Sequence, residues 1–431
     1  MDASLDKLYQ SFQDHPDICI DSRKVTKGCL FFAFKGSSFD GNAFAQDAID
    51  RGAKFAIIDD PDYKTGAQFI LVNDVLNTLK DLARIHRTRL KATFIGITGT
   101  NGKTTTKELI SRVLSTKYST HSTQGNLNNH IGVPLTILSC GSSSEMVVVE
   151  MGANHLGEIE ELCEIARPDF GLITNIGKAH LEGFGNFERI IEAKSELFRF
   201  IKSHNGKAFV NIDNVLLVRL SNQIERITYG SSRKCSLRGR IINNLPYLKI
   251  KWKSEGPWET LNTKIFGDYN FENVIAALCV GNYFGIKPDE MRNVIENYTP
   301  DNNRSQLIKT AHNQIILDAY NANPTSMTAA LKNFGALDQP NKLAILGDML
   351  ELGKETKNEH LQIIKLLEAF GIHDIVLIGP VFSRIGASLE CRSFIDVVTA
   401  RHWFQSSPVK NYTILIKGSR GMHLEELVDV F

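Results

Sequence analysis

The 431-residue sequence predicts an α/β protein of three domains: a small N-terminal α/β unit, a central domain with a P-loop-type parallel sheet, and a Rossmann-like C-terminal domain. Two observations predict this class. Short runs of Val, Ile and Leu alternate with longer helical segments, which is typical of parallel sheets covered on both faces. The chain is also long enough for roughly two to four domains that each bury a core.

The first predicted domain spans residues 1–91. Its apolar runs are CLFFAF, KFAIID and QFILV, and the turn residues of KGSSFDGN follow the first of them. The segment VLNTLKDLARIHRTRL then carries apolar residues at a spacing near 3.6, which predicts a helix.

The central domain is expected over residues 92–300. The strand TFIGIT leads through a glycine turn into the helix TTTKELISRVLSTKY. The buried runs MVVVEM, FGLITNIG and KAFVNID follow, with helical segments between them. Residues 232–265 alternate in polarity and are rich in turns, which predicts an antiparallel patch before the helix NFENVIAALCVGNYFG.

The third domain is expected over residues 301–431. It strings IILDAY, KLAILGDM, DIVLIG and YTILIKG between helical segments. Such βα repeats predict a second, Rossmann-like parallel sheet.

Composition limits the classes of function. The formal net charge of +1 argues against a general nucleic-acid or membrane-surface binder, which needs a basic field. The N-terminus does not read as a signal peptide, and no apolar run reaches the length of a bilayer span, so we expect a cytoplasmic protein. The cysteines are scattered without a C-x-x-C pair, which favours reduced thiols over a zinc site or disulfides.

The glycine turn GITGTNGKTTT resembles a phosphate-binding loop with altered spacing. Gly102, Lys103 and Thr104 fit the end of G-x-x-x-x-G-K-[ST], but the first glycine position falls on Ile97. Backbone N–H groups in such a turn point at phosphate oxygens, and the following helix adds its positive N-terminal end. Lys103 would meet the β- and γ-phosphates and Thr104 would offer a hydroxyl to Mg²⁺. The alternative is a turn that merely caps a βα unit.

Three further residues stand out by position. Glu150 ends the strand MVVVE, at the rim where α/β sheets bind ligands; the alternative is a turn cap. His180 follows the next predicted strand, and a lone histidine is usually structural or solvated. Lys194, taken alone, is a solvated helix lysine.

Asn270 and Asn273 lie one turn apart at a helix start, so both can face one ligand. Amide groups suit the edge of adenine, which offers both a donor and an acceptor. The alternative is that Asn270 caps the helix. Asp318, Tyr320 and Asn321 end the first strand of the third domain, again at the ligand-binding rim.

The form GTNGKT after a strand resembles the loop of the Mur ligase family and of the related folylpolyglutamate synthases. The resemblance runs over nearly the whole chain. The segment from Asp21 to Ile57 looks like the family's uridine-nucleotide domain, VVVEMGANHLGEIEEL and ITNIGKAHLEGFGNFERIIEAKSELF like its metal-site segments, and GDYNFENVIAAL like its adenine segment. DAYNANPTSM and GDMLELG resemble its C-terminal domain.

Within the family, the ligases that add the third residue of the peptide usually carry T-T-P at the place where this chain has GNLNNHIGVP. The D-N-P-R motif of the diaminopimelate-adding ligases does not occur in this sequence either. The resemblance therefore implies an ATP-dependent peptide ligase that joins D-alanyl-D-alanine to UDP-N-acetylmuramoyl-tripeptide through an acyl phosphate. It would release ADP and phosphate in cytoplasmic peptidoglycan synthesis, which serves cell wall biogenesis, cell shape, cell division and the cell cycle. One departure is FDGN, where the family more often has D-G-H, so Asn42 leaves a detail of sugar contact open.

The resemblance also implies residue roles. Catalysis is expected from Lys103, Glu150, His180, Lys194 and Arg304. ATP is expected to contact Gly99, Thr100, Asn101, Gly102, Lys103, Thr104, Thr105, Asn270, Asn273, Arg304, Asp318 and Asn321. Two Mg²⁺ ions are expected at Thr104, Glu150, His180 and a Lys194 carbamylated by CO₂. The other substrates are expected at Ser22, Arg23, Gly36, Asp40, Asn128, Asn129, Tyr320, Asn323, Lys417 and Arg420.

A site split among three domains predicts closure about linkers near residues 92 and 300. We expect the protein to be monomeric.

Two alternative functions stay open. The first is another amide ligase, either the Mur ligase that adds the third residue of the peptide or folylpolyglutamate synthase. The N-terminal DSR…KG…DG segment disfavours folylpolyglutamate synthase. A P-loop binding or regulatory protein would leave Glu150, His180 and Lys194 unexplained.

Overall fold

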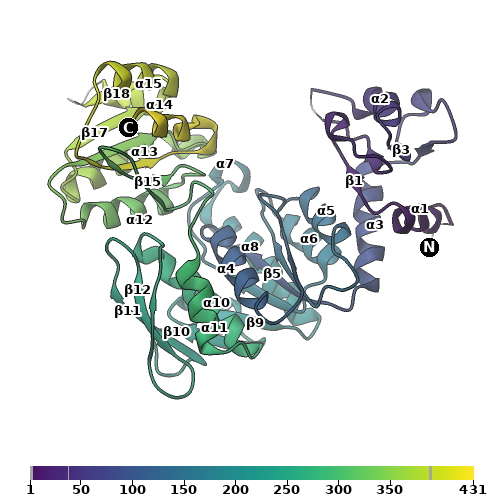
Figure 1. Cartoon of the computed structure of the whole chain (residues 1–431), viewed down its shortest axis with the longest axis horizontal. Helices are drawn as coiled ribbons and strands as arrows, with labels where there is room; N and C mark the ends of the chain where they lie inside the picture. Colours follow the sequence, from purple (N-terminus) through teal and green to yellow (C-terminus); the bar gives the residue numbers. More distant parts are fainter. Residues whose placement is uncertain (1–2, 37, 388–390) are drawn as a thin grey trace.

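The computed structural model describes residues 3–36, 38–387 and 391–431. Three sheets follow one another along the chain, with the central domain between the other two (Figure 1). The α/β class and the three-domain architecture are confirmed. In the described part of the chain no helix is both long and apolar enough to cross a bilayer, and all seven cysteines are free thiols.

The first sheet is parallel, in the order β1-β2-β3-β4. Its strands are β1 (Ile18–Cys19), β2 (Leu30–Phe32), β3 (Phe55–Ile58) and β4 (Phe69–Leu71), and its helices are α1 (Ala3–Asp14), α2 (Ala45–Asp50) and α3 (Val75–Arg89). The apolar runs read from the sequence form β2, β3 and β4, and the predicted helix is α3.

Helix α3 is fixed to the central domain. Lys80 Nζ on α3 lies 2.6 Å from Glu161 Oε1 on α6 (Glu158–Ala166). Arg87 donates to the Ala166 carbonyl at 2.7 Å, and its guanidinium carbon lies 3.8 Å from the ring centroid of Phe94. The same helix also contacts the first domain, because His86 Nδ1 on α3 lies 3.0 Å from the Tyr9 hydroxyl on α1.

The central sheet has the order β13-β12-β11-β10-β9-β8-β5-β7-β6. It is parallel from β6 to β11, and β11, β12 and β13 are antiparallel. The strands are β5 (Thr93–Thr98), β6 (Thr120–Ser122), β7 (Met146–Glu150), β8 (Phe170–Ile173), β9 (Lys207–Asn211), β10 (Glu225–Gly230), β11 (Leu237–Asn243), β12 (Lys249–Lys253) and β13 (Glu259–Asn262). The predicted antiparallel patch is confirmed.

Helices cover this sheet and set the site at its carboxyl edge. They are α4 (Lys103–Leu114), α5 (Gly132–Leu138), α6, α7 (Leu181–Phe184), α8 (Phe187–Ser203), α9 (Val215–Leu220), α10 (Phe271–Tyr283) and α11 (Pro288–Asn297). Strand β5 lies between β7 and β8, because the chain crosses from one side of β5 to the other after β7. The loops that follow these three strands therefore meet at one edge, where α/β sheets bind ligands.

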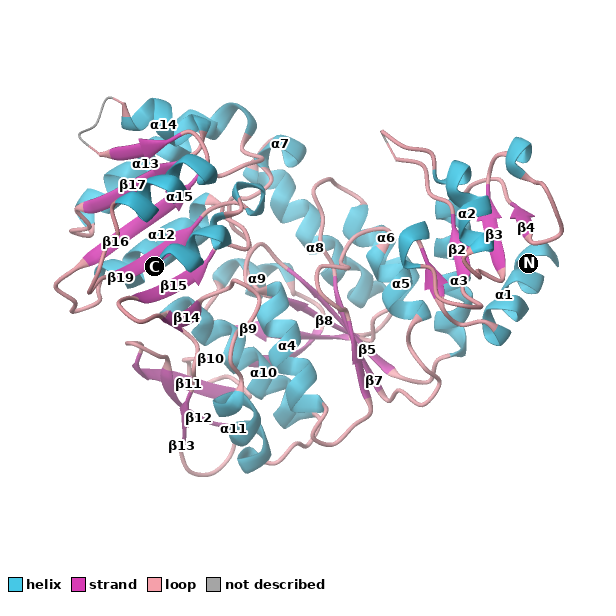
Figure 2. Ribbon diagram, turned by 45° about the horizontal axis from the view of Figure 1, so that its top comes forward, coloured by secondary structure: helices cyan, strands magenta, loops and turns pink. Residues whose placement is uncertain are grey.

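The third sheet has the order β14-β15-β19-β16-β17-β18, parallel except for β14 (Figure 2). Its strands are β14 (Gln306–Lys309), β15 (Gln314–Asp318), β16 (Lys342–Gly347), β17 (Asp374–Ile378), β18 (Arg392–Phe394) and β19 (Thr413–Lys417), and its helices are α12 (Pro324–Gly335), α13 (Thr356–Ala369), α14 (Pro380–Gly386) and α15 (Val397–Ser406). The four predicted strands are β15, β16, β17 and β19. The two edge strands, β14 and β18, were not predicted from the sequence.

Candidate functional site

The loop between β5 and α4 requires glycine at two positions. Gly99 and Gly102 have φ angles of +142° and +78°. A Cβ atom at Gly99 would lie 2.0 Å from Thr174 Oγ1, and one at Gly102 would lie 2.3 Å from Asn273 Oδ1. Both the backbone conformation and the close packing exclude larger side chains. The shifted glycine pattern is thus a tightly packed turn.

The same loop presents a row of unpaired N–H groups. The Thr100 N–H donates to the Asn175 carbonyl at 2.9 Å and the Asn101 N–H to Asn175 Oδ1 at 3.0 Å, which fixes the first half of the loop. The next four N–H groups have no acceptor among the described residues: those of Gly102, Lys103, Thr104 and Thr105. A helix start with free N–H groups is an anion site, so the loop is built to receive phosphate.

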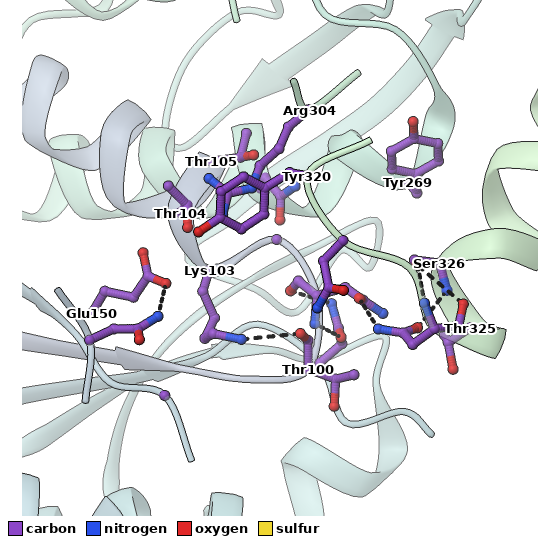
Figure 3. Close-up of a pocket in the computed structure, with 18 of the residues that line it drawn as sticks. Thr100, Lys103, Thr104, Thr105, Glu150, Tyr269, Arg304, Tyr320, Thr325 and Ser326 are labelled. Atoms are coloured by element: carbon purple, nitrogen blue, oxygen red, sulfur yellow. Dashed lines mark hydrogen bonds between the residues drawn. The ribbon is translucent and has the colours of Figure 1, made fainter. Parts of the chain in front are cut away.

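Lys103 is folded back onto its own loop. Its Nζ donates to the carbonyls of Gly99 at 2.8 Å and Thr100 at 3.2 Å (Figure 3). Removal from water lowers the pKa of Lys103, and Arg304 lowers it further, while Glu150 acts in the opposite direction. No ion pair joins Lys103 to any acidic side chain that the structure describes. This ammonium lacks a counter-ion.

Glu150 carries an unsatisfied oxygen. It ends β7 beside Ile97 of β5 and is 1% exposed. Oε1 accepts from Asn128 Nδ2 at 2.8 Å, whereas Oε2 is buried with no hydrogen-bond partner among the described residues. A buried carboxylate oxygen without a partner is costly. The residue therefore fits a bound cation better than the turn cap that the sequence left open.

Lys194 is buried, in contrast to the solvated lysine that its position alone suggests. It lies on α8, is 2% exposed, and its Nζ donates to the Ala153 carbonyl at 3.3 Å. Burial lowers the pKa of Lys194 to about 7, with repulsion from Lys103 adding to the effect and Glu158 and Glu196 opposing it. The amine is thus largely neutral near pH 7.5, where an exposed lysine is charged.

His180 is held by the C-terminal domain. It has a φ of +50°, precedes α7, and its Nδ1 contacts Glu351 Oε2 in a short hydrogen bond. This bond lowers the pKa of Glu351. Within the described residues no three His, Cys, Asp or Glu side chains converge closely enough to hold a metal. The structure thus brings Glu150 and His180 to one cavity without joining them in a finished ligand set.

Two arginines of the third domain contact Tyr320. The Arg304 guanidinium carbon lies 3.5 Å from the Tyr320 ring centroid and that of Arg420 lies 5.0 Å from it. Arg420 Nη1 also donates to the Tyr320 hydroxyl at 3.1 Å. Figure 3 shows Arg304 and Tyr320 above the loop that carries Lys103. These cations stack on an aromatic face, so Arg304 belongs to the cavity and is not an ordinary surface arginine.

Asp318 and Lys417 form a buried pair next to Tyr320. Lys417 Nζ lies 2.6 Å from Asp318 Oδ2, and Lys417 is 1% exposed. Asp318 Oδ1 accepts from the Ser305 N–H at 3.0 Å. Asn321 Oδ1 accepts from the Ala322 N–H at 2.9 Å. These residues shape the wall of the cavity.

The side chains of Asn270 and Asn273 are hydrogen-bonded to each other at the start of α10. Asn273 Nδ2 donates to Asn270 Oδ1 at 2.8 Å, and Asn270 Nδ2 donates to the Phe266 carbonyl at 2.9 Å. Thr106 Oγ1 on α4 donates to Asn273 Oδ1 at 3.0 Å. The side chain of Asn270 makes no capping bond to α10, and both amides line the cavity.

Asn323 ties the third domain to the phosphate loop. Its Oδ1 accepts from the Ser326 N–H at 2.9 Å as the N-cap of α12, and its Nδ2 donates to Asn101 Oδ1 at 2.8 Å. Asn129, also named as a substrate contact, accepts from the N–H groups of Ile131 at 3.1 Å and Gly132 at 2.8 Å. Each of these asparagines thus already has a structural partner.

The predicted uridine-nucleotide residues lie apart, in the first domain. Ser22, Arg23, Gly36 and Asp40 are absent from the walls of the cavity. Arg23 donates to Asp21 through two nitrogens at 2.8 Å, which lowers the pKa of Asp21 to about 2.

Asn42 is the departure from D-G-H. It is fully buried and bonds Asp40 Oδ1 at 2.8 Å and Asp59 Oδ1 at 2.9 Å. Its role in the structure is therefore to join two segments of the first domain.

The cavity that collects these groups has a volume of about 820 Å³ and lies between the central and C-terminal domains. One neighbouring residue was missed from the sequence. Lys107 lies one turn after Lys103 on α4, is 4% exposed, and its Nζ donates to the Thr123 carbonyl at 2.8 Å. Burial lowers its pKa, with Glu108 and Glu150 opposing. Its i+4 spacing from Lys103 was the available signal.

Three family models match in sequence order: "Mur ligase family, catalytic domain" over residues 17–92, "Mur ligase middle domain" over 97–281 and "Mur ligase, glutamate ligase domain" over 303–420. A UDP-N-acetylmuramoyl-tripeptide–D-alanyl-D-alanine ligase of Bacillus subtilis (strain 168) is 35% identical, covering 95% of this chain and 92% of the relative.

Two solved structures agree in fold over the full length. A crystal structure of MurF from Acinetobacter baumannii is 28% identical with a TM-score of 0.87, covering 99% of this chain and 97% of the other. MurF from Thermotoga maritima in complex with ADP is 26% identical with a TM-score of 0.86, covering 100% and 98%. With all three of its domains matched in order and a relative this similar over nearly its whole length, the chain belongs to the Mur ligase family.

Proposed function

We propose that this protein is the ATP-dependent ligase that joins D-alanyl-D-alanine to UDP-N-acetylmuramoyl-tripeptide. The observation that carries the proposal is the composition of one cavity. It combines a phosphate loop with free N–H groups, the unsatisfied carboxylate of Glu150, and Arg304 stacked on Tyr320. The 35% identity to a ligase of that name supports the choice of substrates.

The proposed reaction activates a carboxylate and then uses it. An oxygen of the tripeptide carboxylate attacks the γ-phosphorus of ATP, the bond to the β-phosphate oxygen breaks, and ADP leaves. The amine of D-alanyl-D-alanine attacks the acyl phosphate carbon, loses a proton, and inorganic phosphate departs as the amide forms. The difficult part is electrostatic, because a carboxylate must approach a polyanion.

The chain's own residues address that repulsion. The N–H groups from Gly102 to Thr105 hold the phosphates of ATP, and Lys103 turns from the carbonyls of Gly99 and Thr100 toward the β- and γ-phosphates. Arg304 reaches over from the third domain to the transferred group. Asn270 and Asn273 face adenine, and Asp318 and Asn321 complete the nucleotide side.

Magnesium fits the residues present. Glu150 offers a buried free oxygen, and Thr104, at the start of α4, lines the same cavity. We assign Thr104, Glu150, His180 and a carbamylated Lys194 as the groups that would hold two Mg²⁺ ions, which supply positive charge against the phosphates. His180 must first leave Glu351. The largely neutral amine of Lys194 supports carbamylation, because only an unprotonated amine attacks CO₂.

The remaining substrate contacts extend across the domains. We assign UDP-N-acetylmuramoyl-tripeptide to Ser22, Arg23, Gly36, Asp40, Asn128 and Asn129, and D-alanyl-D-alanine to Tyr320, Asn323, Lys417 and Arg420. The domain limits proposed for these roles are residues 1–91, 92–300 and 301–431. Because the first four residues lie outside the cavity, the first domain must swing inward. Small-angle scattering should show compaction on adding an ATP analogue with the UDP substrate.

An ADP-release assay tests the proposal. ADP should form only when UDP-N-acetylmuramoyl-tripeptide and D-alanyl-D-alanine are both present, and each acceptor is omitted in turn. Release driven by a single amino acid would favour a ligase for the third residue, and release driven by folate and glutamate would favour the folate enzyme. ADP release that does not depend on D-alanyl-D-alanine would contradict the assignment.

The proposed setting follows from the substrates. A ligase that consumes ATP and a soluble UDP-linked precursor works in the cytoplasm, as a monomer, in peptidoglycan synthesis. Its loss would affect cell wall biogenesis, cell shape, cell division and the cell cycle. The free cysteine thiols are consistent with a reducing compartment.

A further inference from the structure

Four cations of the β11–β12 hairpin, together with Trp258 just before β13, form a basic face. Arg238 lies directly opposite Lys253, and Arg240 lies directly opposite Lys251. All four cations surround the indole of Trp258, at 5.2 to 6.0 Å from its ring centroid. Like charges placed opposite one another across two strands destabilise a sheet. A solvated hairpin normally avoids this arrangement, so the repeated pairing calls for a partner.

No acidic side chain that the structure describes forms an ion pair with the basic face. None of its four cations has an ion-pair partner among the described residues. Glu259, at the start of β13, is paired with Arg292 on α11 at 2.9 Å. Glu255 lies exposed in the turn after β12 and forms no ion pair with a described residue. The positive charge therefore remains available to a ligand.

The basic face lies on the side of the hairpin away from the core, where Arg240 is exposed and the other four residues are half-buried. The opposite side of the same strands buries Ile250 and Trp252 in the core under α10. Gly239 shows how closely that helix approaches, because a Cβ there would lie 2.3 Å from Ile275 Cδ1. Figures 1 and 2 place β11, β12 and β13 at the outer end of the central sheet, with α10 and α11 beside them. The basic face is thus the uncovered side of a three-stranded antiparallel extension.

We propose that this face binds the surface of an anionic phospholipid bilayer. Lysine and arginine side chains reach lipid phosphates while their stems stay near the apolar boundary, and tryptophan prefers that boundary. Ile242 follows on β11 and is 49% exposed, which adds an apolar group at the end of the face. A single-stranded nucleic acid would need a groove and several free aromatic faces for stacking. Here the strands are flat and the one indole is already surrounded by cations.

The near-neutral net charge of the chain does not conflict with such binding. Electrostatic attraction to a membrane acts over a Debye length of about 8–10 Å. Charges on distant domains are screened, and only the face turned to the lipid counts. Each lysine or arginine near an anionic surface strengthens binding about fivefold, so three of them account for about 100-fold.

Vesicle co-sedimentation of the full-length protein tests the proposal without reference to its catalytic activity. Vesicles of phosphatidylcholine with 30% phosphatidylglycerol should bind the protein at low salt, and pure phosphatidylcholine vesicles should not. The triple variant Arg240→Gln, Lys251→Gln, Lys253→Gln should lose about 100-fold in partition coefficient. None of these residues lines the cavity, so ADP release should be unchanged.

A matched control removes three exposed lysines from the third domain: Lys357→Gln, Lys365→Gln and Lys410→Gln. It changes the net charge equally and should bind as the original protein does. Lipids brominated on their acyl chains should quench tryptophan fluorescence, and Trp258→Phe should abolish the quenching, because Trp252 is buried in the core and Trp403 lies on α15 of the third domain, away from this face. Equal loss in the control, equal binding to neutral vesicles, or binding of a 20-nucleotide oligonucleotide in place of vesicles would overturn the proposal.

Discussion

Lys194 offers the sharpest test of the site, because its burial should cost stability. We predict that Lys194→Met makes the protein more stable near pH 7 while abolishing ADP release. A lysine with a pKa of about 7 in the folded chain and 10.5 in the unfolded chain disfavours folding by about 4 kcal/mol at pH 7. Methionine fills a similar volume without a charge, and imperfect packing reduces the expected gain to about 2–4 kcal/mol.

The pH dependence fixes the sign of the effect. Between pH 7 and 10.5 the unfolded chain binds a proton at Lys194 and the folded chain does not, so the stability of the original protein rises with pH. The advantage of Lys194→Met should therefore shrink by about 1.4 kcal/mol for each pH unit above 7. Below pH 7 both states are protonated, and the advantage should stay constant.

Urea unfolding followed by tryptophan fluorescence, to which the buried Trp252 contributes, measures this difference between pH 6 and 9.5. Lys202→Met is the matched control, because Lys202 lies exposed on the same helix; its effect should stay within about 0.5 kcal/mol at every pH. A Lys194→Met protein that is less stable than the original, or whose gain does not change with pH, would refute the idea that Lys194 is held neutral.

Three further substitutions probe the rest of the cavity. Gly102→Ala forces a left-handed φ and a contact with Asn273, so it should cost about 1–2 kcal/mol and weaken ATP-analogue binding measured by calorimetry. Glu150→Gln keeps the size of the side chain and removes its charge, so the free energy of unfolding should be little changed. Mg²⁺-dependent ADP release should fall at least about 100-fold. Retained Mg²⁺ dependence would exclude Glu150 as a ligand. Asn323→Ala loses the α12 cap and the bond to Asn101, which should cost about 1 kcal/mol in thermal unfolding, and an unchanged melting temperature would count against the cap.

Local signals predicted the phosphate loop well. A buried strand, a glycine turn and an amphipathic helix follow one another within residues 93–114, and each has its own short-range pattern. The pairing of Asn270 with Asn273 was likewise readable from their spacing on one helix. Edge strands β14 and β18 were missed because they are short and only partly buried, which leaves no continuous apolar run.

Long-range contacts set the limit of what the sequence could reveal. The bond from His180 to Glu351 joins residues 171 positions apart, and nothing near either residue predicts it. Lys194 is a different case, because its burial was readable in retrospect. Ile190, Leu197 and Phe198 are buried on α8, and Lys194 lies on the same helical stripe at a spacing of three or four residues. A charged residue inside an apolar stripe was the signal.

Opposite charges on the central domain are held apart from one another. Lys103 and Lys194 are bonded to backbone carbonyls, while Glu150 is held by Asn128 and keeps one free oxygen. Glu150 is near enough to raise the pKa of Lys103, yet the two form no ion pair within the described structure. If they did, the site would neutralise itself and lose its attraction for both a triphosphate and a cation. Keeping opposite charges apart on the central domain therefore preserves both attractions. In the proposed reaction the third domain adds the charge of Arg304, and the neighbouring domains bring the substrates.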